Sequence, residues 1–150
     1  MTKPLLMLTV LLLSLSAFAS NPANTTSSLI DQAISHSHRN EADRKSDMHR
    51  HPKAVLSFAQ IKEGDVVLDV FAGGGYYSEL SAHIVGAKGR VDAFNNQAYL
   101  GFVGDQLTQR LANNGLPNIR RLDQEVDQLQ LAPNTYDVII ASMAFHDVYY

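Results

Sequence analysis

Two short stretches of this sequence carry residues that suit chemistry rather than packing. In the first, Asp69 precedes a turn that contains Gly73 and Gly75. Glycine adopts positive φ at little cost and lets the backbone approach a ligand closely, because no Cβ intrudes. In the second, His146 and Asp147 stand together near the end of the sequence. An imidazole with a pKa of about 6.5 suits a general base at neutral pH, and packing or hydrogen bonding is the alternative role for His146.

The elements that flank Asp69 are those of the first half of a nucleotide-binding βαβ unit. Val66–Val70 is a short, β-branched apolar run, as expected of a central parallel strand buried on both faces. After the glycines, Tyr77, Leu80 and Ile84 follow at helical spacing. A strand, a glycine turn and a helix therefore predict a cofactor pocket at the turn.

The rest of the sequence alternates strands with helices. Gly64 is expected to end a helix that begins at Pro52, and Asn40 is a candidate cap for the charged helix before it. Alternation at this pitch predicts an α/β fold, an open parallel sheet with helices on both faces. The predicted elements are helices at Pro52–Lys62, Ser78–Val85 and Leu100–Leu111, strands at Arg90–Asn95, Ile119–Leu122 and Tyr136–Met143, and a loop at Asn96–Gly101.

The first nineteen residues are predicted to be a signal peptide. Lys3 gives a positive start, Leu5–Leu15 an apolar core, and Ala17-Phe18-Ala19 a cleavage motif. We expect cleavage after Ala19, no stable membrane anchor and a periplasmic or secreted mature chain; an uncleaved N-terminal anchor is the alternative. The expected organisation is residues 1–19 as signal peptide, 20–38 as a flexible segment and 39–150 as one domain.

Composition narrows the classes of partner and site. The 150 residues carry a net charge of −3 without a long basic run, so nucleic acid is not expected as a partner. The absence of cysteine excludes disulfides and thiolate metal sites. Four histidines, His36, His38, His49 and His51, raise a metal hypothesis, but their spacing favours a solvated helical face, and no metal is expected.

Four segments follow one another along the sequence: VLDVFAGGGYYSEL, GRVDAFN, NIRRLDQE and YDVIIASMAFHD. In order and spacing they resemble the class I S-adenosylmethionine-dependent methyltransferases, whose fold is Rossmann-like. From about Arg39 the sequence resembles, more narrowly, a group of predicted secreted or periplasmic bacterial methyltransferases. In that group an Arg/Asp-rich helix and an R-x-P-type turn precede the glycine motif, and Arg50-His51-Pro52 is the match. The resemblance implies S-adenosylmethionine as cofactor and a small-molecule acceptor.

The resemblance also implies roles for single residues. Phe71 stands where the family has its first glycine, and Asn95 stands where the family has an acid that binds the ribose hydroxyls. Glu125 falls at the position of an acid near the adenine amine, and Val126 offers a backbone N–H beside it. His146 and Asp147 follow the fourth strand, where related enzymes face their acceptor, and are the catalytic candidates. The implied cofactor-binding set is Asp69, Phe71, Ala72, Gly73, Gly75, Asn95, Glu125 and Val126.

Other interpretations stay open at this stage. In a nicotinamide-dinucleotide fingerprint read from Gly73, Ser78 stands in place of the third glycine, and Asn95 replaces the expected acid. A glycine turn without any ligand is a further possibility. The family domain has seven strands and four are predicted here, so a non-catalytic nucleotide-like binding module, or a truncated inactive relative, is the alternative function. In the order 3-2-1-4 the strand Tyr136–Met143 is an edge without lysine or proline, which allows self-association through it.

Overall fold

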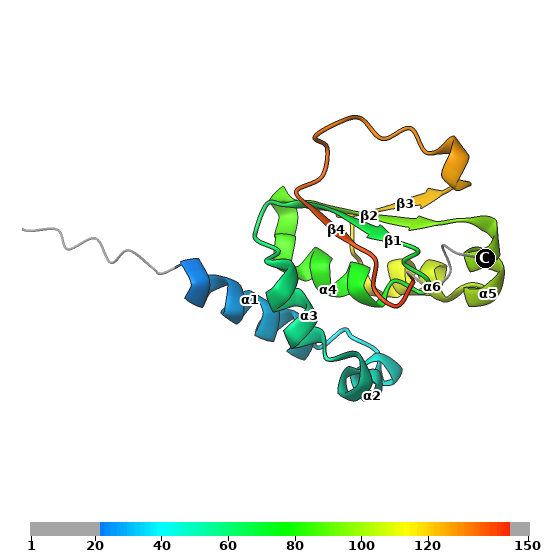
Figure 1. The fold of residues 1–150 in the computed structure, drawn as a ribbon. Helices are drawn as coiled ribbons and strands as arrows, with labels where there is room; N and C mark the ends of the chain where they lie inside the picture. The colour runs from blue at the N-terminus through cyan, green and yellow to red at the C-terminus, as the bar shows by residue number, and fades with distance from the viewer. Residues whose placement is uncertain (1–21, 145–150) are drawn as a thin grey trace, which may run out of the picture.

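The computed structural model describes residues 22–144, which form the predicted α/β fold. All strand pairs are parallel, and the strand order β3-β2-β1-β4 is the predicted one (Figure 1). The signal peptide, His146 and Asp147 lie outside these residues. The strands are β1 (Val66–Val70), β2 (Arg90–Asn95), β3 (Ile119–Asp123) and β4 (Val138–Ile140).

The helices differ from the predicted ones at their ends, and the single helix predicted at Leu100–Leu111 is wrong, because Gly104 and Asp105 divide it into two helices. The predicted loop at Asn96–Gly101 is wrong, because Asn96 accepts a hydrogen bond from the Tyr99 N–H and caps a helix there. Gln60, in the left-handed region, ends the helix that starts at Pro52, well before Gly64. The helices are α1 (Pro22–Ser35), α2 (Glu41–Arg50), α3 (Pro52–Ala59), α4 (Tyr76–Val85), α5 (Gln97–Val103) and α6 (Gln106–Asn114), with short 3₁₀ helices η1 (Gly86–Lys88) and η2 (Val126–Gln128).

The segment 20–38, expected to be flexible, instead contains α1. Leu29, Ile30, Ala33 and Ile34 fall on one side of this helix, and Ile30 and Ala33 are buried. The helix packs against α3 and α4, so it belongs to the core of the domain. The polar run before Leu29 gave no sign of this, because the packing that stabilises α1 comes from elements much later in the sequence.

The α-helices cover one face of the sheet (Figure 1). Val67 and Val91, side by side in β1 and β2, pack there with Leu80 and Ile84 of α4. Right-handed connections in the order β1, β2, β3 place α4, α5 and α6 on the same side. We expected helices on the other face as well. Among residues 22–144, that face has only the short η2, in the segment 124–137 that leads from β3 to β4. None of the described helices is long and apolar enough to cross a membrane.

The other face of the sheet holds a buried acid. Asp92, in the middle of β2, is fully buried and accepts hydrogen bonds from Arg90, Arg120 and the Tyr136 hydroxyl. Burial raises the pKa of Asp92, but these hydrogen bonds outweigh it and hold the pKa below its ordinary value. Tyr136 comes from the segment that leads to β4, so this contact ties that segment to the sheet.

Candidate functional site

The glycine turn lies at the carboxyl end of β1, where ligands bind in parallel α/β sheets. Ala72 donates its N–H to the Phe94 carbonyl of β2, and the Gly75 N–H bonds back to the Ala72 carbonyl. Gly73 has a φ of 58° and Gly75 a φ of 80°, conformations that favour glycine. The turn therefore has a fixed shape and a sequence that fits it.

Asn95 holds this turn from the end of β2. Its Oδ1 accepts a hydrogen bond from the Gly73 N–H at 2.8 Å, and its Nδ2 donates to the Gly73 carbonyl at 3.1 Å. The side chain is fully buried. Both ends of the amide are thus occupied by the turn itself, at the position where the resemblance implied contact with ribose.

The last two glycines of the turn make room for α6. A Cβ on Gly75 would lie 2.7 Å from the Leu107 side chain, and a Cβ on Gly74 would lie 2.7 Å from the Gln106 side chain. The structure therefore gives a reason for Gly75 other than the approach of a ligand: the helix packs directly on the turn.

Asp69 is buried beside the turn and faces α4. The Ser78 hydroxyl donates a 2.6 Å hydrogen bond to its Oδ2, and only 3% of Asp69 is exposed. Burial raises the pKa of Asp69 to about 6, against the opposing effects of the Ser78 hydrogen bonds and the positive charge of Arg50. This acid is poised to change its charge near neutral pH, as functional carboxylates often are.

An aromatic group borders the turn on the side of α5. Phe71 has a φ of 54°, an uncommon conformation for a side chain of this size. Its ring stacks on Tyr99 with 4.6 Å between ring centroids and lies 5.3 Å from the Phe94 ring. These contacts stabilise Phe71 where the family has a glycine.

Glu125 lies close to the same edge of the sheet. Its Oε1 accepts a hydrogen bond from the Gln97 N–H at 3.1 Å, at the start of α5. Val126 follows it and is 59% exposed. The structure thus places Glu125 beside the end of β2, while Asp69, Phe71, Ala72, Gly73, Gly75 and Asn95 gather at the turn.

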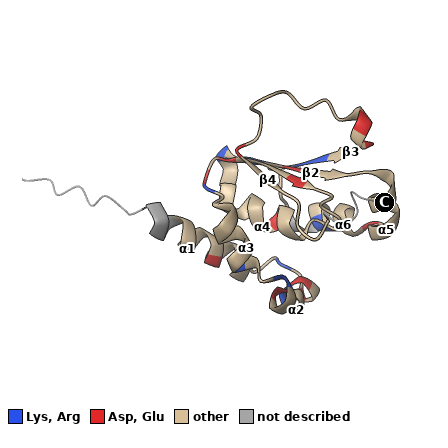
Figure 2. Cartoon of the chain, viewed as in Figure 1, with Lys and Arg blue, Asp and Glu red and all other residues tan. Residues whose placement is uncertain are grey.

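Helix α2 supplies contacts that sequence reasoning missed. Figure 2 shows acidic and basic residues interleaved along α2, a pattern typical of a solvated helix. Yet Asp47 accepts two hydrogen bonds from the buried guanidinium of Arg39, at 2.6 and 2.9 Å, and a third from the Tyr76 hydroxyl. Arg50 lies 4.6 Å over the Tyr76 ring, and its carbonyl accepts a hydrogen bond from the Tyr77 hydroxyl. Helix α2 is therefore bound to the first residues of α4, next to the glycine turn.

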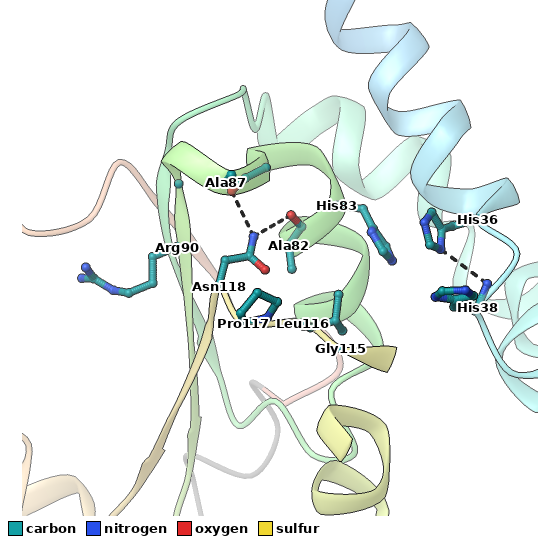
Figure 3. A pocket seen from close by; sticks show the side chains of 12 residues that line it. His36, His38, Ala82, His83, Ala87, Arg90, Gly115, Leu116, Pro117 and Asn118 are labelled. Carbon is teal, nitrogen blue, oxygen red and sulfur yellow. Dashed lines mark hydrogen bonds between the residues drawn. The ribbon is translucent and has the colours of Figure 1, made fainter. Parts of the chain in front are cut away.

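A separate cavity of about 710 Å³ opens at the amino ends of β2 and β3 (Figure 3). His36 stacks on His83 there with 3.8 Å between ring centroids, and His38 meets His36 edge to face. His49 and His51 do not line this cavity. Within residues 22–144 no group of three or more histidines or acids is arranged to hold a metal ion.

No protein-family model matches this sequence, and no curated protein matches it. Among solved structures, the chain is similar to an S-adenosylmethionine-dependent methyltransferase from Aquifex aeolicus, at 28% identity and a TM-score of 0.60. The match covers 83% of this chain and 60% of that protein. The described residues have a Rossmann-like α/β fold that matches part of that methyltransferase. The chain is also similar to a protein-L-isoaspartate O-methyltransferase, at 19% identity and a TM-score of 0.50 over 59% of this chain and 27% of that one, a likeness of fold alone.

Proposed function

We propose that this chain binds S-adenosylmethionine at the glycine turn and transfers its methyl group to a small-molecule acceptor. The observation that carries the proposal is the turn itself, which joins β1 to α4 in a fold similar to that of an S-adenosylmethionine-dependent methyltransferase over 83% of the chain. The chain spans 60% of the length of that protein, so activity and acceptor are proposals here.

The residues around the turn fit such a cofactor. The stacked rings of Phe71 and Tyr99 offer an apolar surface for a purine. The Glu125 carboxylate already accepts the N–H groups of Gln97 and Gln128, and its remaining lone pairs can accept a further N–H or O–H group. The Arg50 guanidinium, next to Tyr76 and within the electrostatic reach of Asp69, offers donors for a carboxylate. The bound cofactor would supply an electrophilic methyl group, and the protein would orient the acceptor and exclude water. His146 remains our proposal for a base if the acceptor must lose a proton.

The test is a calorimetric titration of the protein with S-adenosylmethionine, with S-adenosylhomocysteine and with a nicotinamide dinucleotide as control. We expect binding of the first two ligands and none of the third. Binding of the dinucleotide alone, or of none of them, would overturn the proposal.

A non-catalytic binding module is the second candidate, and the geometry of Asn95 favours it. Residue 95 is an amide, not a carboxylate, and both of its polar ends are bonded to Gly73, so this side chain cannot bind ribose hydroxyls as strongly as an acid would. Binding of both ligands without methyl transfer to any acceptor in a panel of amines, alcohols, thiols and carboxylates would favour this module.

We further propose that the protein is exported and that the mature chain begins at Ser20. N-terminal sequencing of the protein recovered from a bacterial periplasm tests this, and an intact Met1 in a cytoplasmic fraction would contradict it. We also propose that the protein self-associates through β4, which pairs with β1 alone among residues 22–144.

A further inference from the structure

The Arg110 side chain of α6 joins α2, α4 and the glycine turn through its polar contacts. Its Nε donates a 2.5 Å hydrogen bond to the Gly74 carbonyl, in the middle of the turn. Its Nη1 donates to Glu79 of α4 and to Asp43 of α2. Only 7% of the Arg110 side chain is exposed, and none of the Glu79 side chain. A buried guanidinium thus meets three acceptors from three parts of the chain.

Both acids depend on this arrangement. Burial raises the pKa of Glu79, but the nearby His83 imidazole, 3.9 Å away, and the charge and hydrogen bond of Arg110 outweigh it and hold the pKa below its ordinary value. Removing the guanidinium would take from the buried Glu79 carboxylate its charged partner, which is costly. Asp43 is 14% exposed and is held at the same time by the helix cap, since its N–H bonds to the Asn40 side chain.

Helix α2 is attached to the turn at a second point. Asp47, one turn of helix after Asp43, accepts the Tyr76 hydroxyl, and Tyr76 directly follows Gly75. One carboxylate of α2 therefore reaches the turn through Arg110, and the other reaches the residue that leaves the turn. The Arg/Asp-rich helix, for which the sequence suggested a solvated face, is therefore attached at Gly74, through Arg110, and at Tyr76.

We propose that Arg110 is a positioning residue of the glycine turn. Its pairing with Asp43 couples the docking of α2 to the shape of that turn. The inference rests on the proposed function for its consequence in binding, but the coupling itself concerns the protein alone. When α2 is docked, Arg110 is held by both acids and fixes the Gly74 carbonyl. When the contact to Asp43 is lost, Arg110 keeps its hydrogen bond to Glu79 of α4 but is no longer held by α2.

Two variants and a control separate this role from general stability. Asp43→Asn removes the charge that α2 presents to Arg110 with little change in shape, and Arg110→Lys keeps the charge but loses the planar fork. Glu41→Gln is the control, because Glu41 forms an exposed i, i+4 pair with Lys45 on the same helix. Urea denaturation of each variant establishes that it is folded before any other measurement.

Hydrogen exchange of the turn is the decisive measurement. The amides of Ala72, Gly73 and Gly75 are all hydrogen-bonded, so their exchange reports the order of the turn. In Asp43→Asn we expect exchange of these amides and of α2 to rise about tenfold, the loss of one charge-assisted hydrogen bond, with β1 and β2 unchanged. Glu41→Gln should leave all of them unchanged. Faster exchange confined to α2, with the turn as in the wild type, would overturn the coupling.

Affinity for S-adenosylhomocysteine is the second readout. We expect Asp43→Asn to weaken it about tenfold and Arg110→Lys to weaken it at least as much, while Glu41→Gln binds as the wild type does. Equal affinity in all four proteins would overturn the positioning role. A wild-type chain that does not bind this ligand would instead overturn the proposed function, and the exchange rates would still decide the coupling. If Arg110→Lys fails to fold, Asp43→Asn decides alone.

Discussion

At the scale of single residues, the buried Asp69 makes the stability of the fold depend on pH. Its pKa of about 6 in the folded protein lies above the ordinary value of 3.8, so the folded state binds the proton more tightly. The stability that this proton contributes is present at low pH and is lost as the pH rises from about 4 to about 6. Above that range the buried carboxylate costs about 3 kcal/mol.

We therefore predict that Asp69→Asn stabilises the fold at pH 8 by about 1–3 kcal/mol and has little effect near pH 4. The Ser78 hydroxyl can still donate to the new amide oxygen. Urea denaturation of both proteins at the two pH values measures this, and exposed Asp105 provides the control variant Asp105→Asn. A difference between Asp69→Asn and wild type that does not change with pH would contradict the assigned pKa.

Asn95 gives a second prediction at this scale. Asn95→Asp keeps an acceptor for the Gly73 N–H but loses the donor to the Gly73 carbonyl and buries a charge. We expect it to destabilise the protein by about 1–3 kcal/mol. Asn96→Asp is the matched control, since Asn96 caps α5 and aspartate caps helices equally well. Tighter cofactor binding by Asn95→Asp without loss of stability would mean that this side chain faces the ligand instead.

The sequence indicated which residues gather at the turn, but not how they use their polar atoms. Asp69 and Gly73 are separated by few residues, so a local pattern connects them. Arg110 is 36 residues from Gly74, and nothing near it marks the contact. Asn95 drew attention as a substitute for an acid, whereas its bonds to Gly73 depend on how β2 ends beside the turn. Such contacts follow from tertiary packing, which sequence periodicity does not describe.

At the scale of elements, the glycine turn and α6 are matched in shape. We predict that Gly75→Ala destabilises the protein by about 1–3 kcal/mol, because φ is 80° and the new Cβ meets Leu107 at 2.7 Å. Gly101→Ala is the control: it lies inside α5 with nothing within 4 Å, and should stabilise by about 0.5–1 kcal/mol. Thermal and urea unfolding compare the two. Equal stability for Gly75→Ala and wild type would show that α6 moves away at no cost.

The strands were more predictable than the helices, and the reason is physical. Buried parallel strands such as β1 are short apolar runs, so β1 and β2 have the predicted limits. The start of α5 was missed because Asn96 and Gly101 are typical of loops, although Asn96 acts as a cap. The predicted strand Tyr136–Met143 is reduced to Val138–Ile140. Just before β4, the Asp137 carboxylate accepts a hydrogen bond from the Val66 N–H, in place of a further backbone hydrogen bond between β1 and β4.

At the scale of the whole molecule, the sheet has an open side at β4. Among residues 22–144, β4 pairs with β1 alone. Ile139 is aligned with Leu68 of β1, yet it is 65% exposed while Leu68 is buried. Met143, a few residues later, is 68% exposed. An apolar edge strand of this kind, without lysine or proline to discourage pairing, is a site for pairing with another chain.

We therefore predict that the protein self-associates through β4, and that Ile139→Lys reduces the association. A lysine on an edge strand opposes edge-to-edge pairing, because a second copy would bring its charge close to its equivalent. Size-exclusion chromatography with light scattering compares the two proteins over a range of concentrations. Phe102→Lys is the control, since Phe102 is 88% exposed on α5, away from β4. If the wild-type protein is a monomer at all concentrations and unfolds in a sharp cooperative transition, β4 does not pair with a second copy. Equal loss of association in both variants would place the contact elsewhere, because the control removes apolar surface without touching the edge.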